Sequence, residues 1–329
     1  AEGIFSKSLN DVYYKNLAYE ESGKTLSQTS YMNWDNRPLY TKVADAKSFT
    51  NIYAMYNTSK GYSYSLSLSA AKHFAFGLDL NASYTFTHSE SVSSMTSSVA
   101  QSNWRNTHTY RFSNNPELAN SGYNVPHTVK ASAFYHFNWG TNKLFTTTVG
   151  LIYQGQSGSP YSLVYSGDIN GDNGTSNDLI FIPTDAQVDQ MQFLGTDAYT
   201  AEQQRANLKQ WLATTRYVKD HRGEYFERYG DNLPFESHFD FHFGQKFGIR
   251  TGKYVHALEL TLDIMNVANL LNKDWGRTFS SGYNSEFVSP ITYKGDGVFQ
   301  FANPSDMPLK YPSSYYSRWR GQVGLKYTF

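Results

Sequence analysis

The sequence predicts an all-β protein, an antiparallel transmembrane β-barrel with about eight strands in this chain, and three observations support this. Several segments alternate apolar and polar side chains, as strands with one apolar face do. Aromatic residues make up 17% of the 329 residues and charged residues only 17%, which suits β-sheets and the aromatic girdles of membrane barrels. Short and long connections alternate along the chain, so all the short turns fall at one end of the sheet, as in outer-membrane barrels.

The first four strands are expected at 4–18, 50–73, 75–90 and 125–139. Alternation is clearest in YSYSLSLSA, where Tyr64 and Leu66 share one face and serines occupy the other. Phe134 interrupts the alternation of the fourth strand. NTSKG lies inside the second range, which we interpret as one strand because the alternation resumes directly and a hairpin there would disturb the sorting of the connections.

The last four strands are expected at 143–157, 236–248, 254–270 and 315–329. The final stretch, RWRGQVGLKYTF, alternates up to Phe329, with an apolar, mostly aromatic face opposite a face that holds Arg318, Arg320 and Lys326. Short turns are expected near Ala75, at 140–142 and at 249–253. Long loops are expected at about 19–48, 90–124, 158–235 and 271–314.

Two long loops contain structure of their own. DAYTAEQQRANLKQWLATTR is predicted to be a helix, because Thr200 and Gln203 form a capping-box pattern ahead of an apolar stripe. ITYKGDGVFQF is predicted to be a hairpin that turns at Gly-Asp-Gly. We therefore expect a folded extracellular surface.

Composition excludes several classes of protein. The formal net charge is zero, so no basic surface for nucleic acid is expected. The chain has no cysteine, which removes disulfides and thiolate chemistry, and no apolar run is long enough for a transmembrane helix. No G-x-S-x-G, H-E-x-x-H or P-loop pattern occurs, so no enzyme is predicted, and an outer-membrane hydrolase is the least favoured function. The start, AEGIFSKS, lacks Met and a signal peptide, and we expect a fragment or a processed product.

Several stretches resemble known outer-membrane proteins. LELTLDIMNVANLLNKDWG, followed by a loop and WRGQVGLKYTF, resembles the last two strands of TonB-dependent outer-membrane receptors. YNTSKGYSYSLSLS and GSPYSLVYSGDINGDNGTSNDLIFIP resemble the Oar-like subgroup of Bacteroidota, and GDINGDNGTSNDLIFIP is the more specific motif. The alternating last strand that ends in Phe is similar to the signal read by the barrel-assembly machinery. The resemblance covers nearly the whole chain.

The resemblance implies the bacterial outer membrane and a barrel of roughly 22 strands with an N-terminal plug. This chain departs from that pattern, because it has no plug and no TonB box, so 1–329 is expected to be a single segment holding the last eight strands. The implied partners are outer-membrane lipid, the TonB complex through the missing N-terminal region, a surface lipoprotein, and an extracellular small ligand, glycan or peptide. The alternative is a self-contained eight-stranded barrel with a structural or adhesive role.

One block of the sequence predicts a metal site. Oxygen ligands for Ca²⁺ are offered by Asp168, Asn170, Asp172, Asn177 and Asp178. The block resembles EF-hand and dockerin-type loops but departs from both, because Gly174 falls one place late and Leu179 stands where the EF-hand has an acid. The alternative is a turn rich in Asn, Asp and Gly at the extracellular rim. No cofactor other than Ca²⁺ is predicted.

Further residues have a possible function that the sequence supports less strongly. ESHFDFHF places four residues that could ligate a metal on one strand face, namely Glu236, His238, Asp240 and His242. An ordinary polar barrel interior is the favoured interpretation of these four. Asn266 and Asn269 are expected to turn the upper end of their strand. Girdle positions are expected, with plain packing as the alternative, at Tyr62, Trp139, Trp275, Trp319 and Tyr327.

Overall fold

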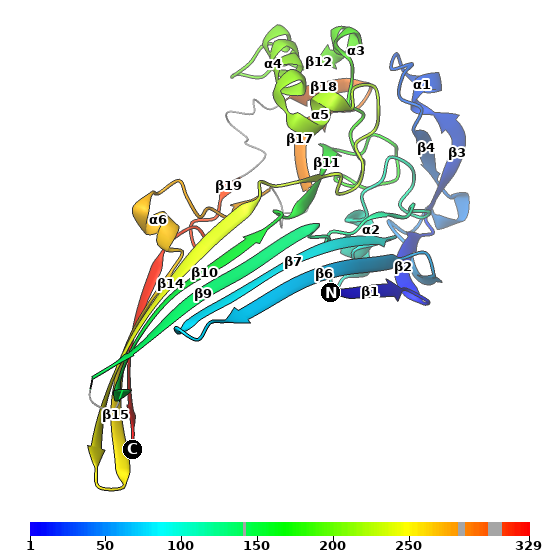
Figure 1. Cartoon of the computed structure of the whole chain (residues 1–329). Coiled ribbons are helices and arrows are strands. Elements are labelled where there is room, and N and C mark those ends of the chain that lie inside the picture. The colour runs from blue at the N-terminus through cyan, green and yellow to red at the C-terminus, as the bar shows by residue number, and fades with distance from the viewer. Residues whose placement is uncertain (141–142, 282–286, 302–310) are drawn as a thin grey trace.

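The computed structural model describes residues 1–140, 143–281, 287–301 and 311–329. Its main feature is a twisted antiparallel sheet of eight long strands with a compact unit at one end (Figure 1). In spatial order the strands are β1 (Glu2–Lys7), β6 (Tyr62–His73), β7 (Leu78–Ser91), β9 (His127–Trp139), β10 (Phe145–Gln156), β14 (Glu236–Thr251), β15 (Tyr254–Met265) and β20 (Arg320–Thr328). The two-residue β8 (Ala119–Asn120) pairs with the end of β7.

The strand register gathers the apolar side chains on one face of the sheet. One row across five neighbouring strands consists of Leu80, Ala133, Leu151, Phe241 and Ile264. Leu66 and Leu325 on the same face are 58% and 71% exposed, and within the eight strands Ala257 is the only buried hydrophobic side chain. The sheet has no packed core of its own, so its apolar face requires apolar surroundings.

The connections are sorted by length, as predicted. Short turns join β6 to β7, β9 to β10 and β14 to β15 at what we call the turn end, and the long connections lie at the loop end (Figure 1). Gly77 in the first turn has a φ of +95°, and a Cβ there would lie 2.3 Å from the His136 carbonyl oxygen, so glycine is required. Residues 141 and 142 of the predicted turn at 140–142 lie outside the described residues.

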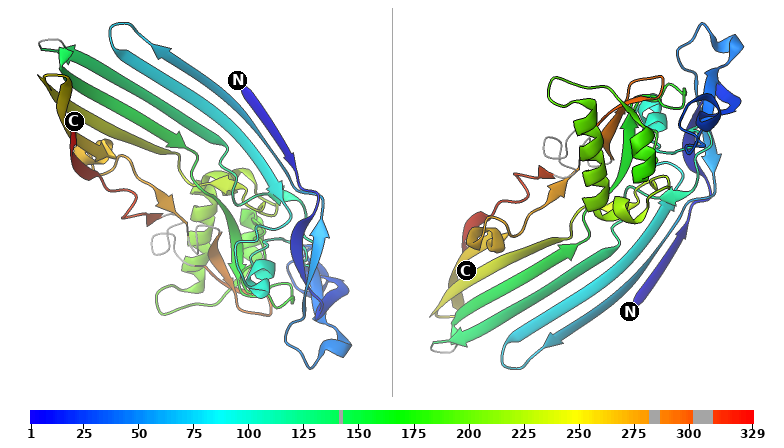
Figure 2. Two further views of the ribbon diagram at one scale, coloured as in Figure 1. Left: turned by 90° about the horizontal axis from the view of Figure 1, so that it is seen from below. Right: turned by 90° about the horizontal axis from the view of Figure 1, so that it is seen from above.

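Two expected strands, 4–18 and 50–73, are each divided in the structure. The first becomes β1 and β2 (Asp11–Asn16), and the second becomes β5 (Tyr53–Thr58) and β6. Lys7 lies opposite Tyr62 and Asp11 opposite Thr58, so the pairing continues in register across the break and NTSKG forms no hairpin. At the break Ser8 N–H still donates to the Gly61 carbonyl oxygen at 2.9 Å, and a Cβ at Gly61 would lie 2.9 Å from Ser8 Oγ, so glycine makes room for the Ser8 side chain. Beyond it β2 runs away from the sheet (Figure 2).

Two other expected strands are shorter than predicted. Within the range 254–270, β15 ends at Met265. The strand ends there because the next residue, Asn266, adopts a left-handed conformation with a φ of +54° and precedes the one-turn helix α6 (Val267–Leu271). The range 315–329 gives β20 only from Arg320. The preceding residues form a turn, in which Ser317 N–H donates to the Ser313 carbonyl oxygen at 3.0 Å.

Phe134, the exception to the alternation, lies on the polar face directly opposite Gly150, which in turn lies opposite His242. Its ring centroid is 6.0 Å from that of His242. A Cβ at Gly150 would lie 2.4 Å from the Phe134 ring, so the glycine makes room for the aromatic ring.

Gly150→Ala is expected to destabilise the sheet by about 1–3 kcal/mol, because the added methyl group overlaps the Phe134 ring. The double variant Gly150→Ala/Phe134→Ala should recover part of this loss. The measurement is urea unfolding followed by the gel mobility of the folded barrel. Gly321→Ala is the matched control, since its nearest neighbour would be 3.7 Å away. Equal effects of the two alanines would contradict the prediction.

At the loop end, residues 158–235 and 287–301 form a packed unit that we call the cap (Figures 1 and 2). Its five short strands, in the order in which they pair, are β12 (Gln192–Phe193), β18 (Val298–Phe301), β17 (Phe287–Tyr293), β11 (Pro160–Ser166) and β13 (Asp231–Asn232). Its helices are α3 (Asp185–Gln190), α4 (Ala201–Thr214) and α5 (Arg216–Asp220). Leu163, Ile180, Leu208, Phe226 and Phe299 are fully buried, so the main hydrophobic core lies in the cap and not in the sheet.

The predicted helix and hairpin are both confirmed in the cap. Helix α4 begins after Thr200, whose Oγ1 accepts the Gln203 N–H at 3.2 Å while Gln203 Oε1 accepts the Thr200 N–H at 2.8 Å. β17 and β18 form the hairpin, and Asp296 at its tip has a φ of +50°. None of the helices in the described ranges is both long and apolar enough to span a membrane.

The other long connections complete the loop end. The N-terminal arm, residues 8–61, contains β2, β5, β3 (Tyr19–Thr25), α1 (Leu26–Thr29), β4 (Pro38–Lys42) and the 3-10 turn η1 (Ala44–Ala46). The connection between β7 and β9 contains α2 (Ala100–Arg105). The connection between β15 and β20 contains β16 (Phe279–Ser280) and β19 (Tyr311–Pro312), which pair with each other.

Candidate functional site

The acidic loop, residues 167–178, leaves the end of β11 and returns beside it. Gly167 N–H donates to the Thr175 carbonyl oxygen at 2.8 Å, and Tyr165 N–H donates to the Asp178 carbonyl oxygen at 2.8 Å. Inside the loop, Asp168 accepts the backbone N–H groups of Gly171 and Asn173 at 2.7 and 2.8 Å. The local sequence therefore dictates a tight turn rich in Asn, Asp and Gly, as one interpretation predicted.

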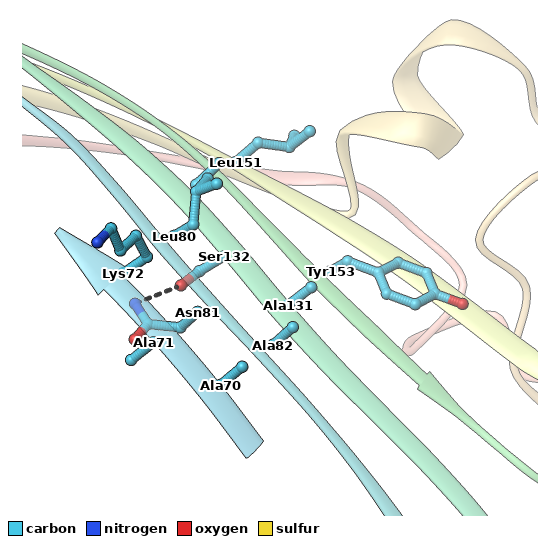
Figure 3. Close-up of a pocket in the computed structure, with 11 residues that line it drawn as sticks. Ala70, Ala71, Lys72, Leu80, Asn81, Ala82, Ala131, Ser132, Leu151 and Tyr153 are labelled. Atoms are coloured by element: carbon cyan, nitrogen blue, oxygen red, sulfur yellow. Dashed lines mark hydrogen bonds between the residues drawn. The ribbon is translucent and has the colours of Figure 1, made fainter. Parts of the chain in front are cut away.

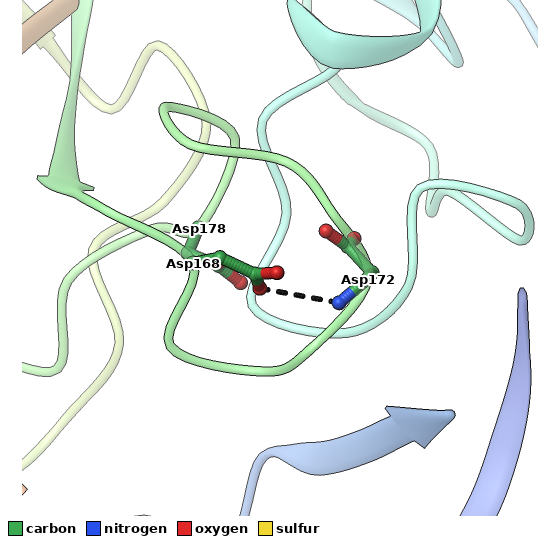
Figure 4. A group of neighbouring side chains, drawn as sticks. All are labelled: Asp168, Asp172 and Asp178. Carbon is green, nitrogen blue, oxygen red and sulfur yellow. Dashed lines mark hydrogen bonds between the residues drawn. The ribbon is translucent and has the colours of Figure 1, made fainter. Parts of the chain in front are cut away.

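The turn gathers the three acids among the five predicted ligands. Carboxylate oxygens of Asp168, Asp172 and Asp178 all lie within 4.8 Å of one another (Figure 4). Asn170 is buried beside them, but its Oδ1 accepts the Asp172 N–H at 3.0 Å and its Nδ2 donates to the Arg111 carbonyl oxygen. The structure thus brings the three acids together and gives Asn170 a positioning role in the loop.

Little positive charge balances this cluster. In the part of the chain that the structure describes, one ion pair reaches it, from Arg37 Nη1 to Asp178 Oδ1 at 3.5 Å. Arg37 also pairs with Asp35 at 3.0 Å, so its charge is shared. Burial, together with the charge of Asp168, raises the pKa of Asp172 to about 7. Burial and Asp172 raise the pKa of Asp178 well above its usual value. The fold thus holds these carboxylates in an environment that disfavours their charge.

Sequence reasoning missed Arg37 and Asp35. Both lie in the N-terminal arm, more than a hundred residues from the loop, and nothing in NWDNRP signals that they approach it. Asn177, which the sequence offered as a ligand, donates from Nδ2 to Asp172 Oδ2 at 2.9 Å. A buried acid generally needs hydrogen-bond or charge partners, so the acids themselves indicate that partners exist. Only the fold shows which residues these partners are.

The set on β14 has separate protein partners. His242 Nδ1 lies 2.6 Å from Asp263 Oδ1, His238 Nε2 lies 3.1 Å from Thr278 Oγ1, and Asp240 Oδ1 accepts the Asn266 N–H at 2.7 Å. Within the described ranges the acidic loop is the only group of three or more ligand-type side chains close enough to hold an ion. His238, Asp240 and His242 are therefore each occupied by a partner within the protein.

A cavity of about 640 Å³, which we call the rim cavity, opens on this polar face at the loop end. It is lined by Glu236, His238 and Asp240 of β14 and by Tyr316, Arg318 and Arg320 near the start of β20. Asn266, predicted to turn the strand, borders this cavity and donates from Nδ2 to the carbonyl oxygens of Gly276 and Ser317. Asn269 donates in the same way to the carbonyl oxygens of Lys273 and Trp275.

The cavity drawn in Figure 3 is of another kind, a hollow of about 490 Å³ on the sheet itself. Ala70, Ala82 and Ala131 lie opposite one another on β6, β7 and β9, and the larger Leu151 and Tyr153 stand beside them. The hollow exists because short side chains lie next to long ones on the apolar face. Its polar lining residues are Lys72, Asn81 and Ser132, and Asn81 Nδ2 donates to Ser132 Oγ at 3.4 Å (Figure 3).

The comparison with known families decides the identity of this fold. A family described as outer membrane beta-barrel domain matches residues 5–287. The chain belongs to this family. No curated protein and no solved structure matches it.

The protein is therefore an outer-membrane β-barrel protein of the bacterial outer membrane. In such barrels the apolar face meets lipid, the polar face lines the interior, and the long loops are extracellular. The alanine row of Figure 3, Ala70, Ala82 and Ala131, thus belongs to the lipid-facing surface. Near the turn end, Trp139, Phe145 and Phe247 lie side by side on that surface, and Tyr327 follows them in the same row, which is the place expected for an interfacial girdle.

Proposed function

We propose that the chain is the C-terminal barrel portion of a TonB-dependent outer-membrane receptor, of the Oar-like subgroup of Bacteroidota, that binds an extracellular nutrient and takes part in its energised uptake. The observation that supports this most is the open sheet. In the described structure β1 pairs with β6 alone and β20 with β15 alone, so the first and last strands are free edges. We infer that further strands of a larger barrel cover them.

The argument for a larger barrel is energetic. Lipid offers no hydrogen bonds, and each unpaired backbone N–H or C=O costs several kcal/mol there, so an open edge is not tolerated in a membrane. A self-contained eight-stranded barrel with an adhesive role would need β1 to pair with β20. The N- and C-terminal ends lie on opposite borders of the sheet (Figure 2), which favours the larger barrel.

Two features of the loop end favour ligand binding. The rim cavity is lined by two arginines, two carboxylates and two aromatic rings, a lining suited to a polar ligand. The cap is a folded unit with its own core, and such a unit can present a defined extracellular surface. The proposed partners of the protein are a surface lipoprotein and the TonB complex.

Crosslinking tests whether the edges meet. The chain has no cysteine, so engineered pairs give a clean result. Ile4→Cys/Gln322→Cys, both on the polar face of the edge strands, is expected to give no bis-maleimide crosslink in outer membranes. Ser67→Cys/Thr85→Cys is the positive control, since these hydroxyl oxygens lie 2.9 Å apart. A crosslink across the edges would support the self-contained barrel.

Uptake is tested in cells of the source bacterium. Spent medium is compared by mass spectrometry between wild-type cells and cells that lack the protein, with and without a protonophore. We expect at least one compound whose depletion requires both the protein and the proton-motive force. The intact protein from outer membranes should also be heavier than 37.4 kDa, because several hundred further residues, including a plug, are expected. No receptor-dependent depletion would contradict the proposed transport.

A further inference from the structure

We propose that the acidic loop binds one Ca²⁺ ion through Asp168, Asp172, Asp178 and Asn177, and that this ion joins the N-terminal arm, the connection between β7 and β9, and the cap into one extracellular unit. This inference is independent of transport, because it concerns the loop end alone. It holds whether the barrel has eight strands or more.

The first argument is the convergence of hard oxygen ligands. The three carboxylates approach within 4.8 Å of one another, and Asp172 and Asp178 are fully buried. Like charges at this separation repel, and the shared Arg37 offsets only part of the charge. A divalent cation among them would supply the missing positive charge.

The second argument is a pair of buried oxygens with no hydrogen-bond partner. Asn177 is fully buried, and its Nδ2 donates to Asp172 Oδ2 at 2.9 Å and to Ser113 Oγ at 3.1 Å, whereas its Oδ1 has no hydrogen-bond partner among the described residues. Asp178 Oδ2 is likewise buried and unpartnered. Buried polar atoms are nearly always satisfied, so two such oxygens at one cluster indicate a ligand that takes their lone pairs.

The third argument selects the ion. The cluster offers oxygen atoms from a loop of irregular conformation, which suits the flexible coordination of Ca²⁺ better than the strict octahedron of Mg²⁺. A soft transition metal would prefer imidazole or thiolate. The loop lies on the extracellular side, where calcium sites of millimolar affinity are common.

The fourth argument concerns what the ion would connect. The Asn170 carbonyl oxygen accepts the N–H of Tyr40 in the N-terminal arm at 2.8 Å. Thr109, in the connection between β7 and β9, donates its N–H to the Asn177 carbonyl oxygen at 2.9 Å and accepts the Leu179 N–H at 3.1 Å. Arg37 of the arm reaches Asp178. Three segments distant in sequence therefore meet at this loop, and fixing the loop fixes them.

The test is hydrogen exchange of the full protein in detergent, with CaCl₂ as the only added metal. At about 1 mM Ca²⁺ we expect exchange in 165–179 and 107–113 to slow roughly tenfold or more relative to chelator. Asp172→Asn should remove this response without destabilising the chelator-treated protein, because it relieves charge repulsion. Asp189→Asn, an exposed acid on α3, is the charge-matched control and should keep the response.

Asn177→Asp keeps a ligand oxygen and adds a fourth charge. With Ca²⁺ bound, its exchange should match that of the wild-type protein, and in chelator it should be faster. Three results would overturn the proposal. They are an unchanged wild-type exchange at about 1 mM Ca²⁺, an equal effect of Mg²⁺ at the same concentration, or an Asn177→Asp variant that calcium does not restore.

Discussion

Arg37→Met is expected to destabilise the cap by about 3–5 kcal/mol, because it leaves buried carboxylates without their cation. Arg37 is fully buried, pairs with Asp35 and Asp178, and donates from Nη2 to the Leu179 carbonyl oxygen at 3.0 Å. Its guanidinium also lies over the Tyr165 ring, 5.1 Å from the centroid. Native-state hydrogen exchange of cap peptides measures the change in opening free energy.

The control for this variant is Arg216→Met. Arg216 pairs with Asp231 on the surface of the cap, and its side chain is 75% exposed, so its loss should cost less than about 1 kcal/mol. Arg37→Lys should also be destabilising, because one ammonium cannot reproduce the planar contacts to Asp35, Asp178 and Leu179. Equal stability of the Arg37→Met and Arg216→Met variants would show that the buried pair does not hold the cap together.

His108→Leu is expected to remove an acid sensitivity of the loop end. His108 is fully buried, its two ring nitrogens have no partner among the described residues, and it lies against Tyr229 and Phe287. Burial, with a further contribution from Arg228, lowers its pKa from 6.5 to about 3. Between these values the unfolded state binds more protons than the folded state, so stability falls as the pH falls.

The expected loss is up to about 1.4 kcal/mol per pH unit below 6.5 in the wild-type protein relative to His108→Leu. The difference between the two proteins isolates His108, because the contributions of Asp172 and Asp178 are common to both. Hydrogen exchange between pH 7.5 and 4.5, corrected for intrinsic rates, gives this difference. His221→Leu is the control, since His221 is only partly buried and its Nδ1 lies 2.8 Å from the Tyr217 carbonyl oxygen. A parallel pH dependence in wild-type and His108→Leu would contradict the prediction.

The candidate site shows where sequence reasoning reached its limit. The spacing of Asp168, Asp172 and Asp178 predicted their convergence, because a turn rich in Asn, Asp and Gly must fold back on itself. Asp35 and Arg37 were not predictable, since their place beside Asp178 depends on how the N-terminal arm folds over the cap. The rim cavity was also not predictable as a cavity, because Glu236 begins β14 whereas Arg318 lies in the turn before β20, far from it in the sequence.

By itself the sequence determined the strands, their two faces and the sorting of turns and loops, because alternation with period two is a local property of the backbone. It also determined α4, whose capping box is a local hydrogen-bond pattern. Only the tertiary structure decided the break at Ser8 and Gly61, the place of Phe134 over Gly150, and the open edges at β1 and β20. Each of these depends on which backbones and side chains meet across the sheet, and such long-range contacts are not encoded in any single stretch of the chain.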